Sequence, residues 1–198
     1  MNNAASARTA LPLCAAALAA LALMVGHAQA GPIEISAQPA TAMLDTGDPL
    51  DVAVAISGLD NDDLGGFDLS LAFDPVVLRY QSYSLGMELA DPIFGVYDLS
   101  DDSDAPSGLL QLAEAATLID LTGQPDAFVL ATVSFIALRP GTTALTLSSI
   151  GLFDDLGDPL AVDTVSDASA TVPLPSTLLL MAAGIGLLQL RRRRACRS

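Results

Sequence analysis

Carboxylates are the side chains of this sequence whose type and spacing could do chemistry. The chain has 198 residues; its only histidine is His27, its two cysteines are Cys14 and Cys196, and it has no lysine or tryptophan. Residues 31–172 therefore lack the side chains of a Ser-His-Asp or Cys-His nucleophile, a Schiff-base lysine and a His/Cys zinc site. Pairs of carboxylates remain, and these could hydrolyse a glycosidic or a peptide bond.

One fragment, Asp45-Thr46-Gly47, has the letters of an aspartic-protease loop. Such an enzyme needs two of these loops to share one proton, and the chain has no second copy, so only a homodimer would be active. The alternative interpretation is a turn that leads into a strand at Leu50. A carboxylate hydrolase is accordingly the third of three functional hypotheses, behind two kinds of binding module.

Acidic loops are the other place where carboxylates could act together. The stretch 98–104 contains Asp101, Asp102 and Asp104, whose oxygens are the ligands that calcium prefers. The alternative interpretation is a solvated acidic loop. Calcium is thus the one cofactor that the sequence suggests, through these three residues, and no other cofactor is expected.

Short stretches in which apolar and polar residues alternate predict the elements that position these side chains. In 50–57, Leu50, Val52, Val54 and Ile56 alternate with small or polar residues, and 67–74 repeats the pattern. A period of two residues indicates a strand buried on one face. Further strands are expected over 33–37, 78–85, 109–115, 128–138, 143–149 and 168–172, separated by turns rich in Asp, Gly and Pro. With no long helical pattern, the series predicts an all-β fold, an antiparallel β-sandwich.

The acidic balance of the central segment excludes one class of partner. All 23 acidic residues lie between Glu34 and Asp167, whereas the only cations in that span are Arg79 and Arg139, so the segment carries about −21. Binding of nucleic acid needs a basic surface, so no nucleic-acid partner is expected. Binding of a flat polysaccharide needs exposed aromatic rings, but Tyr80 and Tyr83 are expected on opposite faces of one strand, which would expose at most one of them.

Four stretches of the chain, 45–58, 65–78, 130–137 and 141–147, together resemble a known family, the cohesin domains. The stretch 65–78 looks like the third cohesin strand and the turn after it, and 45–58 is similar to the Gly-Asp turn and second strand. The stretch 130–137 is similar to a late core strand and 141–147 to the strand that follows, whereas 87–108 departs from a regular strand pattern. The resemblance implies a jelly-roll sandwich related in fold to carbohydrate-binding modules. Cohesin domains of cellulosomes bind dockerins, so it also implies a protein partner.

The first 30 residues have the organisation of a secretory signal peptide. Arg8 precedes an apolar stretch over 11–25, and Ala28-Gln29-Ala30 provides an Ala-x-Ala cleavage site before Gly31. Such a segment is removed during export, so we expect the mature chain to begin at Gly31 and to carry no disulfide, because Cys14 leaves with the signal peptide.

The last 27 residues have three parts in a fixed order. Val172, Pro173, Leu174 and Pro175 come first, an apolar run over 176–190 follows, and the basic cluster Arg191, Arg192, Arg193 and Arg194 comes last. The run would span about 22 Å as a helix, less than the roughly 30 Å hydrocarbon core, which favours a temporary membrane anchor. The arginines favour the cytoplasmic side of the membrane, so the residues before Val172 would lie on its opposite side.

This tail resembles the PEP-CTERM sorting signals of Gram-negative bacteria, in its Val-Pro-Leu-Pro variant. The resemblance implies that an exosortase recognises and cuts the tail. It further implies export across the inner membrane to the cell envelope, the outer surface or the extracellular polysaccharide matrix. An ordinary tail anchor with a positive-inside flank is the alternative, which the proline pair does not favour.

The sequence as a whole predicts three segments and two leading functions. The segments are a signal peptide over 1–30, a cohesin-like β-sandwich over 31–171, and a sorting signal with a short transmembrane helix over 172–198. The leading hypothesis is a non-catalytic exported interaction or adhesion module, and the runner-up is a carbohydrate-binding module of the same fold. A partner that is purely protein would favour the first, and binding to a glycan the second.

Overall fold

The computed structural model of the chain describes residues 32–60, 62–118 and 120–174. The regular elements of these residues are strands, apart from one turn of 3-10 helix, as the alternating pattern predicts, and turns and irregular loops connect them. The elements are β1 (Glu34–Pro39), β2 (Pro49–Ser57), β3 (Gly66–Ala72), β4 (Leu78–Leu85), β5 (Tyr97–Asp98), η1 (Ala105–Ser107), β6 (Leu109–Ala115), β7 (Phe128–Ala137), β8 (Gly141–Phe153), β9 (Pro159–Leu160), β10 (Thr164–Ser166) and β11 (Ala168–Val172).

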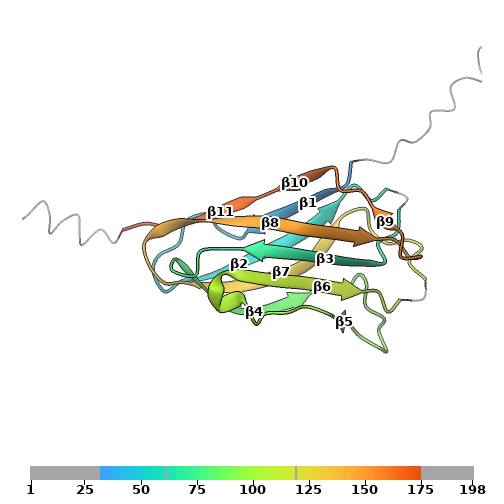
Figure 1. Cartoon of the computed structure of the whole chain (residues 1–198), viewed down its shortest axis with the longest axis horizontal. Helices are drawn as coiled ribbons and strands as arrows, with labels where there is room; N and C mark the ends of the chain where they lie inside the picture. The colour runs from blue at the N-terminus through green and yellow to red at the C-terminus, as the bar shows by residue number, and fades with distance from the viewer. Residues whose placement is uncertain (1–31, 61, 119, 175–198) are drawn as a thin grey trace, which may run out of the picture.

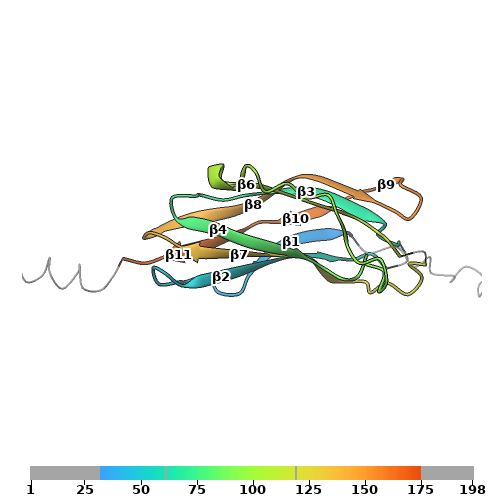
Figure 2. The ribbon, with the colours of Figure 1, turned by 90° about the horizontal axis from the view of Figure 1, so that it is seen from below.

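Two sheets pack face to face, as Figures 1 and 2 show. One sheet has the strand order β10-β1-β2-β7-β4, and the other has the order β11-β8-β3-β6-β5, with β9 paired to β8. The chain changes sheet between β10 and β11 at Asp167, whose Oδ1 accepts a hydrogen bond of 2.8 Å from the backbone N–H of Leu147. The predicted β-sandwich is confirmed.

The prediction of a purely antiparallel sandwich is wrong at one edge, where β10 runs parallel to β1 and pairs Ile35 with Val165. Antiparallel neighbours follow from short hairpins, but these two strands are separated by almost the whole domain, so no hairpin sets their direction. Side-chain and backbone groups of Asp163 hold the pairing together. Its Oδ2 accepts the N–H of Ile33 at 3.1 Å, and its own N–H donates to the Ile33 carbonyl at 3.0 Å.

The core lies between the sheets and is filled by the apolar halves of the alternating strands. Leu50, Val52, Val54 and Ile56 of β2 are all buried, as their spacing predicts. The second sheet faces them with β3, β6 and β8, whose buried side chains include Leu69, Leu71, Leu110, Leu112, Leu145 and Leu147. This core cluster extends from Ile33 to Val172, so almost the whole described part of the chain contributes to one hydrophobic core.

The two ends of the sandwich differ in what they carry. The described chain starts at one end and leaves from the other after β11 (Figure 1). Val172 is the last residue of β11, pairs with Gly141 and is buried, so the sandwich reaches one residue into the expected sorting signal. Within the part of the chain that the structure describes, no helix is long and apolar enough to cross a membrane.

The irregular stretch expected over 87–108 follows the outer strand β4. It contains only the two-residue strand β5 and the short helix η1. β5, β9 and β10 have two or three residues each, which is too short to produce a periodic pattern, and they were not expected. By contrast, β4, β6 and β11 have the predicted bounds.

Candidate functional site

Small residues form the outer surface of the second sheet at one end. Gly66 of β3 pairs with Ala115 of β6, and Asp68 pairs with both Ala113 of β6 and Gly151 of β8. Paired residues of adjacent strands point to the same face, and these positions alternate with the buried leucines, so they face outward. The absence of large side chains here leaves a depression over these positions.

Large apolar side chains border this depression on both sides. Leu99, which follows β5, is 55% exposed on one side; Phe153 and Leu156, at the end of β8, are 40% and 82% exposed on the other. The Phe153 ring lies over Gly151, where a Cβ would be 3.4 Å from its atoms. Together these residues enclose a groove of about 570 Å³. Below, "the groove" means this site, with its base at Gly66, Ala113 and Ala115.

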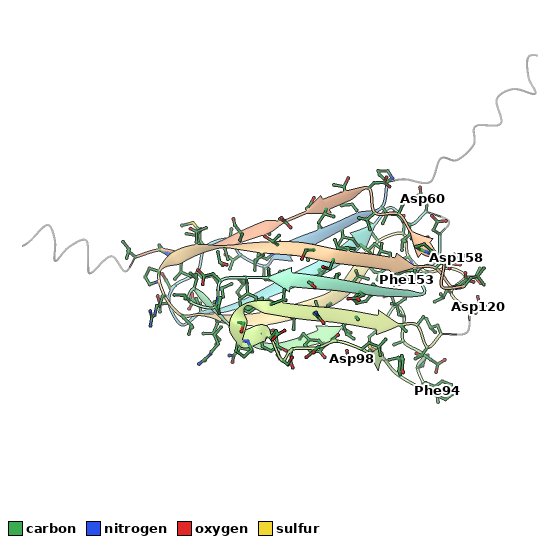
Figure 3. All side chains as sticks on the ribbon, viewed as in Figure 1. Asp60, Phe94, Asp98, Asp120, Phe153 and Asp158 are labelled. Carbon is green, nitrogen blue, oxygen red and sulfur yellow. The ribbon has the colours of Figure 1, made fainter. Side chains whose placement is uncertain are left out.

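Carboxylates surround the apolar part of the groove. Asp68, Asp154 and Asp155 line it together with the apolar residues. Asp154 also shapes the turn, because its Oδ1 accepts the N–H groups of Leu156 at 2.9 Å and Asp158 at 2.7 Å. Figure 3 shows Phe153 and Asp158 close to each other at this end of the molecule. The groove therefore suits a ligand that is apolar in its centre and positively charged at its sides.

Two tyrosine–aspartate hydrogen bonds join the edges of the two sheets beside the groove. The Tyr80 hydroxyl donates to Asp102 Oδ2 at 3.0 Å, and the Tyr83 hydroxyl donates to Asp98 Oδ2 at 2.8 Å. We call this pair of contacts the clasp. It links β4 of one sheet to the segment 98–102 along the edge of the other. The clasp thereby fixes the position of β5 and of Leu99, which follows it.

The clasp corrects the prediction that Tyr80 and Tyr83 lie on opposite faces. The pairing of β4 with β7 shifts register between Tyr80 and Ser82, which marks a β-bulge. The extra residue, Gln81, reverses the alternation, so both tyrosines face inward and pack against the core. The Tyr80 ring meets Phe135 edge to face, with centroids 6.4 Å apart. Neither tyrosine is therefore available as a flat platform for sugar binding.

Burial and charge set the pKa values around the clasp. Burial raises the pKa of both tyrosine hydroxyls, and the hydrogen bonds to Asp102 and Asp98 add to the effect. Burial alone would raise the pKa of Asp98, but hydrogen bonds from Ser100 and Tyr83 outweigh it and lower that pKa. Asp98 is thus an anion that holds a neutral tyrosine.

Glu114 is a buried carboxyl group directly beneath the groove. It alternates with Leu110 and Leu112 on the inner face of β6, is only 2% exposed, and its Oε1 has no hydrogen-bond partner. Burial and, as the smaller effect, the charge of the neighbouring Asp98 together raise the pKa of Glu114 to about 7. Near neutral pH this side chain is therefore divided between its acid and its anion.

The three residues predicted for calcium lie in one loop, but their carboxylates serve different contacts. Asp101 Oδ1 accepts the N–H of Ser103 at 2.9 Å, Asp102 belongs to the clasp, and Asp104 precedes η1 without a side-chain capping bond. Within residues 32–60, 62–118 and 120–174, no group of three or more acidic, His or Cys side chains is arranged to hold a metal ion. Calcium binding stays a prediction.

The other predicted residues lie apart from the groove. Asp45 is exposed in a turn before β2, where its N–H donates to Asp48 Oδ2 at 3.1 Å. Gly47 of the same fragment has a φ of 98°. The fragment 45–47 thus forms a turn that leads into β2, which is the alternative to an aspartic-protease loop. Leu174 is 62% exposed just after β11. The rest of the predicted processing residues, namely Ala28, Ala30, Gly31, Pro175 and Arg191 to Arg194, lie outside the described residues.

Sequence reasoning did not find the groove or Glu114. A signal was present in 109–115, where Ala113 and Ala115 occupy the alternate positions that would normally be polar on an exposed face. Phe153 and Leu156 lie next to a turn, Leu99 follows a strand of only two residues, and periodicity alone does not show that such residues are exposed.

Comparison with known proteins connects this fold to cohesin domains. No protein-family model and no curated protein sequence matches the chain. Solved structures do: a type II cohesin domain of Acetivibrio cellulolyticus has a TM-score of 0.60 and 17% identity, covering 70% of this chain and 95% of that one. A non-cellulosomal cohesin of Archaeoglobus fulgidus has a TM-score of 0.55 and 21% identity, covering 72% and 92%.

A third similar structure is the sixth cohesin of scaffoldin B from Acetivibrio cellulolyticus, solved in complex with a mutant Cel5 dockerin. Its TM-score is 0.57 at 18% identity, and the match covers 71% of this chain and 99% of that one. The described part of the chain thus has a cohesin-like fold, as the four sequence stretches predict.

Proposed function

We propose that this chain is a non-catalytic binding module that holds a protein partner in the groove. The observation that carries the proposal is the groove itself, where an area of Gly and Ala is bordered by exposed Leu99, Phe153 and Leu156. Exposed large apolar side chains around a recess are typical of interaction sites, because burying them in a partner removes apolar surface from water.

The charges specify the chemistry of that partner. Asp68, Asp154 and Asp155 line the groove, and the segment 31–172 carries about −21 overall. A protein that presents an apolar ridge flanked by Lys or Arg would match both the shape and the sign of the site. The dockerin complex of the Acetivibrio cellulolyticus cohesin supports a protein partner for a domain of this fold.

A binding role also agrees with the side chains that the segment contains. Without His, Lys or Cys in 31–172, acid–base chemistry would depend on carboxylates and on three tyrosines, of which Tyr80 and Tyr83 have raised pKa values and are already bonded to Asp102 and Asp98. Glu114, the one buried carboxyl group with a strongly raised pKa among the described residues, borders the groove but is only 2% exposed, so little of it is open to a substrate.

For delivery, we infer that the signal peptide exports the chain and that the tail is a PEP-CTERM sorting signal. In this proposal the apolar run holds the tail in the inner membrane, and an exosortase cuts at the Pro173–Pro175 pair. The burial of Val172 supports a cut after this residue, because any cut within β11 would remove residues that pair with β8. The released domain would then act in the envelope or the extracellular polysaccharide matrix of a Gram-negative bacterium.

The experiment that tests the groove compares two equivalent substitutions on opposite sheets. Ala113→Trp places an indole in the groove, whereas Ala53→Trp places the same group on the outer face of β2 in the other sheet. The segment 31–172 and both variants would be immobilised and exposed to the envelope fraction of the native organism. The bound protein would then be identified, purified and titrated against all three.

We expect the purified partner to bind the unsubstituted domain and the Ala53→Trp variant equally, and the Ala113→Trp variant at least tenfold more weakly, which is about 1.4 kcal/mol. Equal binding by all three would contradict the groove as the site. Capture of a polysaccharide instead of a protein would contradict the protein partner and favour the carbohydrate-binding alternative.

A further inference from the structure

The outermost part of the second sheet, residues 97–102, is attached to β6 by few contacts. β5 pairs with β6 through two residues only, and just beyond them the Leu99 N–H donates to the Ala113 carbonyl at 2.9 Å. Asp101 and Gln111 then exchange two backbone hydrogen bonds of 3.0 Å. We call residues 97–102 the edge segment. A pairing this short is marginal, so we expect the edge segment to open more easily than the longer strands.

Two carboxyl groups stand opposite each other in this short pairing. Asp98 of β5 is the direct partner of Glu114 of β6, and paired residues of adjacent strands point to the same face of the sheet. Asp98 is exposed along the outer edge of the second sheet (Figure 3), whereas Glu114 is buried and its Oε1 has no hydrogen-bond partner. Like charges directly opposite each other destabilise a strand pairing, so an ionised Glu114 would weaken the attachment of β5.

The elements around Glu114 bring acids and no cation toward it. On the side away from β5, the residue paired with Glu114 is the buried Phe67 of β3. The titratable groups of the neighbouring elements are Asp98, Asp101 and Asp102 of the edge segment, Tyr80 and Tyr83 of β4 beside it, Asp68 of β3, and Glu88 and Asp91 of the loop before β5. An ionised Glu114 therefore has no opposite charge beside it among these groups.

Opening of the edge segment would relieve the cost of ionising Glu114. Burial and, as the smaller effect, the charge of Asp98 raise the pKa of Glu114 to about 7, and contact with water would return it toward its ordinary value of 4.5. The closed segment thus holds this proton more tightly than the open one. Closure is favoured fully below about pH 4.5, and the preference is lost as the pH rises toward 7.

We propose that the edge segment is a pH-dependent latch, which is closed over a protonated Glu114 and released when Glu114 ionises opposite Asp98. Release displaces Leu99 from the side of the groove, because Leu99 follows β5 directly. The opening itself does not depend on what the groove binds. Only its consequence, weaker binding of the partner above neutral pH, rests on the proposed function.

Hydrogen exchange of the full chain in a mild detergent, read by NMR at single amides, measures the opening. After correction for the intrinsic exchange rate, the protection of the Leu99 and Asp101 amides should fall at least about fivefold between about pH 5.5 and pH 8. Complete hydration of Glu114 on opening would give about twenty-five-fold. Low concentrations of urea should leave these two protections nearly unchanged while lowering those of β2, because a local opening exposes little surface.

Two variants and one titration assign the effect to Glu114. Glu114→Gln keeps the size of the side chain but cannot ionise, so the corrected protection of Leu99 and Asp101 should no longer change with pH. Glu88→Gln, the matched control, removes an exposed carboxyl group and should retain the full dependence. The carboxyl carbon of Glu114, followed by NMR, should titrate with a midpoint near pH 7.

Protection of Leu99 and Asp101 that does not change with pH in the unsubstituted chain would overturn the proposal. A dependence that Glu114→Gln retains would overturn it too, and so would a Glu114 carboxyl group that titrates near its ordinary value. If urea lowered the protection of Leu99 as steeply as that of β2, the segment would open only when the whole domain unfolds, and the latch would be refuted. These outcomes leave the groove as a binding site untouched, because the Ala113→Trp comparison tests that site separately.

Discussion

Glu114 is a single residue whose burial opposes folding when its carboxyl group is ionised. Its carboxyl group lies among leucines of β6, with one oxygen unpartnered, and burial raises its pKa to about 7. In the unfolded chain the same group has an ordinary pKa near 4.5. The folded state therefore holds its proton more tightly, and ionisation of Glu114 opposes folding.

The first prediction follows from the sign of this difference. Stability from protonated Glu114 is fully present below about pH 4.5 and is lost as the pH rises toward 7, because in that window the folded state binds more protons than the unfolded state. Glu114→Gln cannot ionise, so it should be more stable than the unsubstituted domain at pH 8 by about 2 kcal/mol, after allowance for solvent screening at the end of the sheet. Urea unfolding at pH 4 and pH 8 measures this difference.

Glu88→Gln is the matched control, because it removes one negative charge from an exposed side chain. It should change the free energy of unfolding by less than about 0.5 kcal/mol at either pH. A Glu114→Gln variant whose advantage is the same at both pH values would show that Glu114 does not titrate differently in the folded state.

At the scale of elements, the clasp explains how a two-residue strand can border a binding groove. β5 pairs with β6 only at Tyr97 and Asp98, which would be marginal without further support. The bulge in β4 turns Tyr80 and Tyr83 inward, and their hydroxyls hold Asp102 and Asp98 on the neighbouring edge. The second sheet is thus fixed at its edge by side chains from the first.

The second prediction concerns this contact. Tyr83→Phe removes the hydroxyl and leaves the ring, so the lost hydrogen bond to Asp98 should destabilise the domain by about 1 kcal/mol. Tyr97→Phe, at an exposed side chain, should cost less than about 0.5 kcal/mol. Thermal unfolding of both variants, followed by circular dichroism, gives the comparison, and equal effects would mean that the Tyr83 hydroxyl adds nothing.

The low pKa of Asp98 gives the same contact a pH dependence. Asp98 stabilises the fold above the ordinary value of 3.8, and this contribution is lost as the pH falls through its lowered pKa. The cost of Tyr83→Phe should therefore shrink in strongly acidic solution, where Asp98 becomes protonated.

At the scale of the whole molecule, the groove and the chain exits are arranged along one axis. The tail leaves after β11 at the end where Gly141 begins β8, whereas Phe153 and the groove lie at the other end of that same strand. The acidic loops that contain Asp60, Asp120 and Asp158 gather with Phe153 at this far end (Figure 3). A domain held by its tail would thus carry its groove away from the point of attachment.

The third prediction tests the tail in a whole cell. The full chain would be expressed in a host that contains an exosortase and in the same host without it, and the mass and location of the product would be measured. We expect a soluble or envelope-bound domain that begins at Gly31 and lacks Cys196 in the first host, and a membrane-anchored chain that retains Cys196 in the second.

Replacing Pro173 and Pro175 with Ala should leave the chain exported but uncut in both hosts, because the extended backbone that the prolines impose would be lost. The sandwich should be unaffected, since its last paired residue is Val172. A chain that retains Cys196 and stays in the membrane of both hosts would identify the tail as an ordinary anchor.

Local pattern alone was sufficient for most of the strands and for the class of fold. The alternation of Leu50, Val52, Val54 and Ile56 is visible within a few residues, because the side-chain period of a strand is a local property. The residues of the turns and the cohesin-like order of the four stretches are likewise visible in the sequence. The excluded chemistries followed from composition, since side chains that are absent from 31–172 cannot act there.

Only the tertiary structure determined which side chains are exposed and which of them lie together at the surface. The bulge at Gln81 reverses one tyrosine, the parallel pairing of β10 joins residues about 130 positions apart, and the groove combines Gly66, Ala113 and Phe153 from three strands. These features depend on strand register, and a slip of one residue would move every side chain of a strand to the other face. Register is set by packing between distant segments, which no local pattern contains.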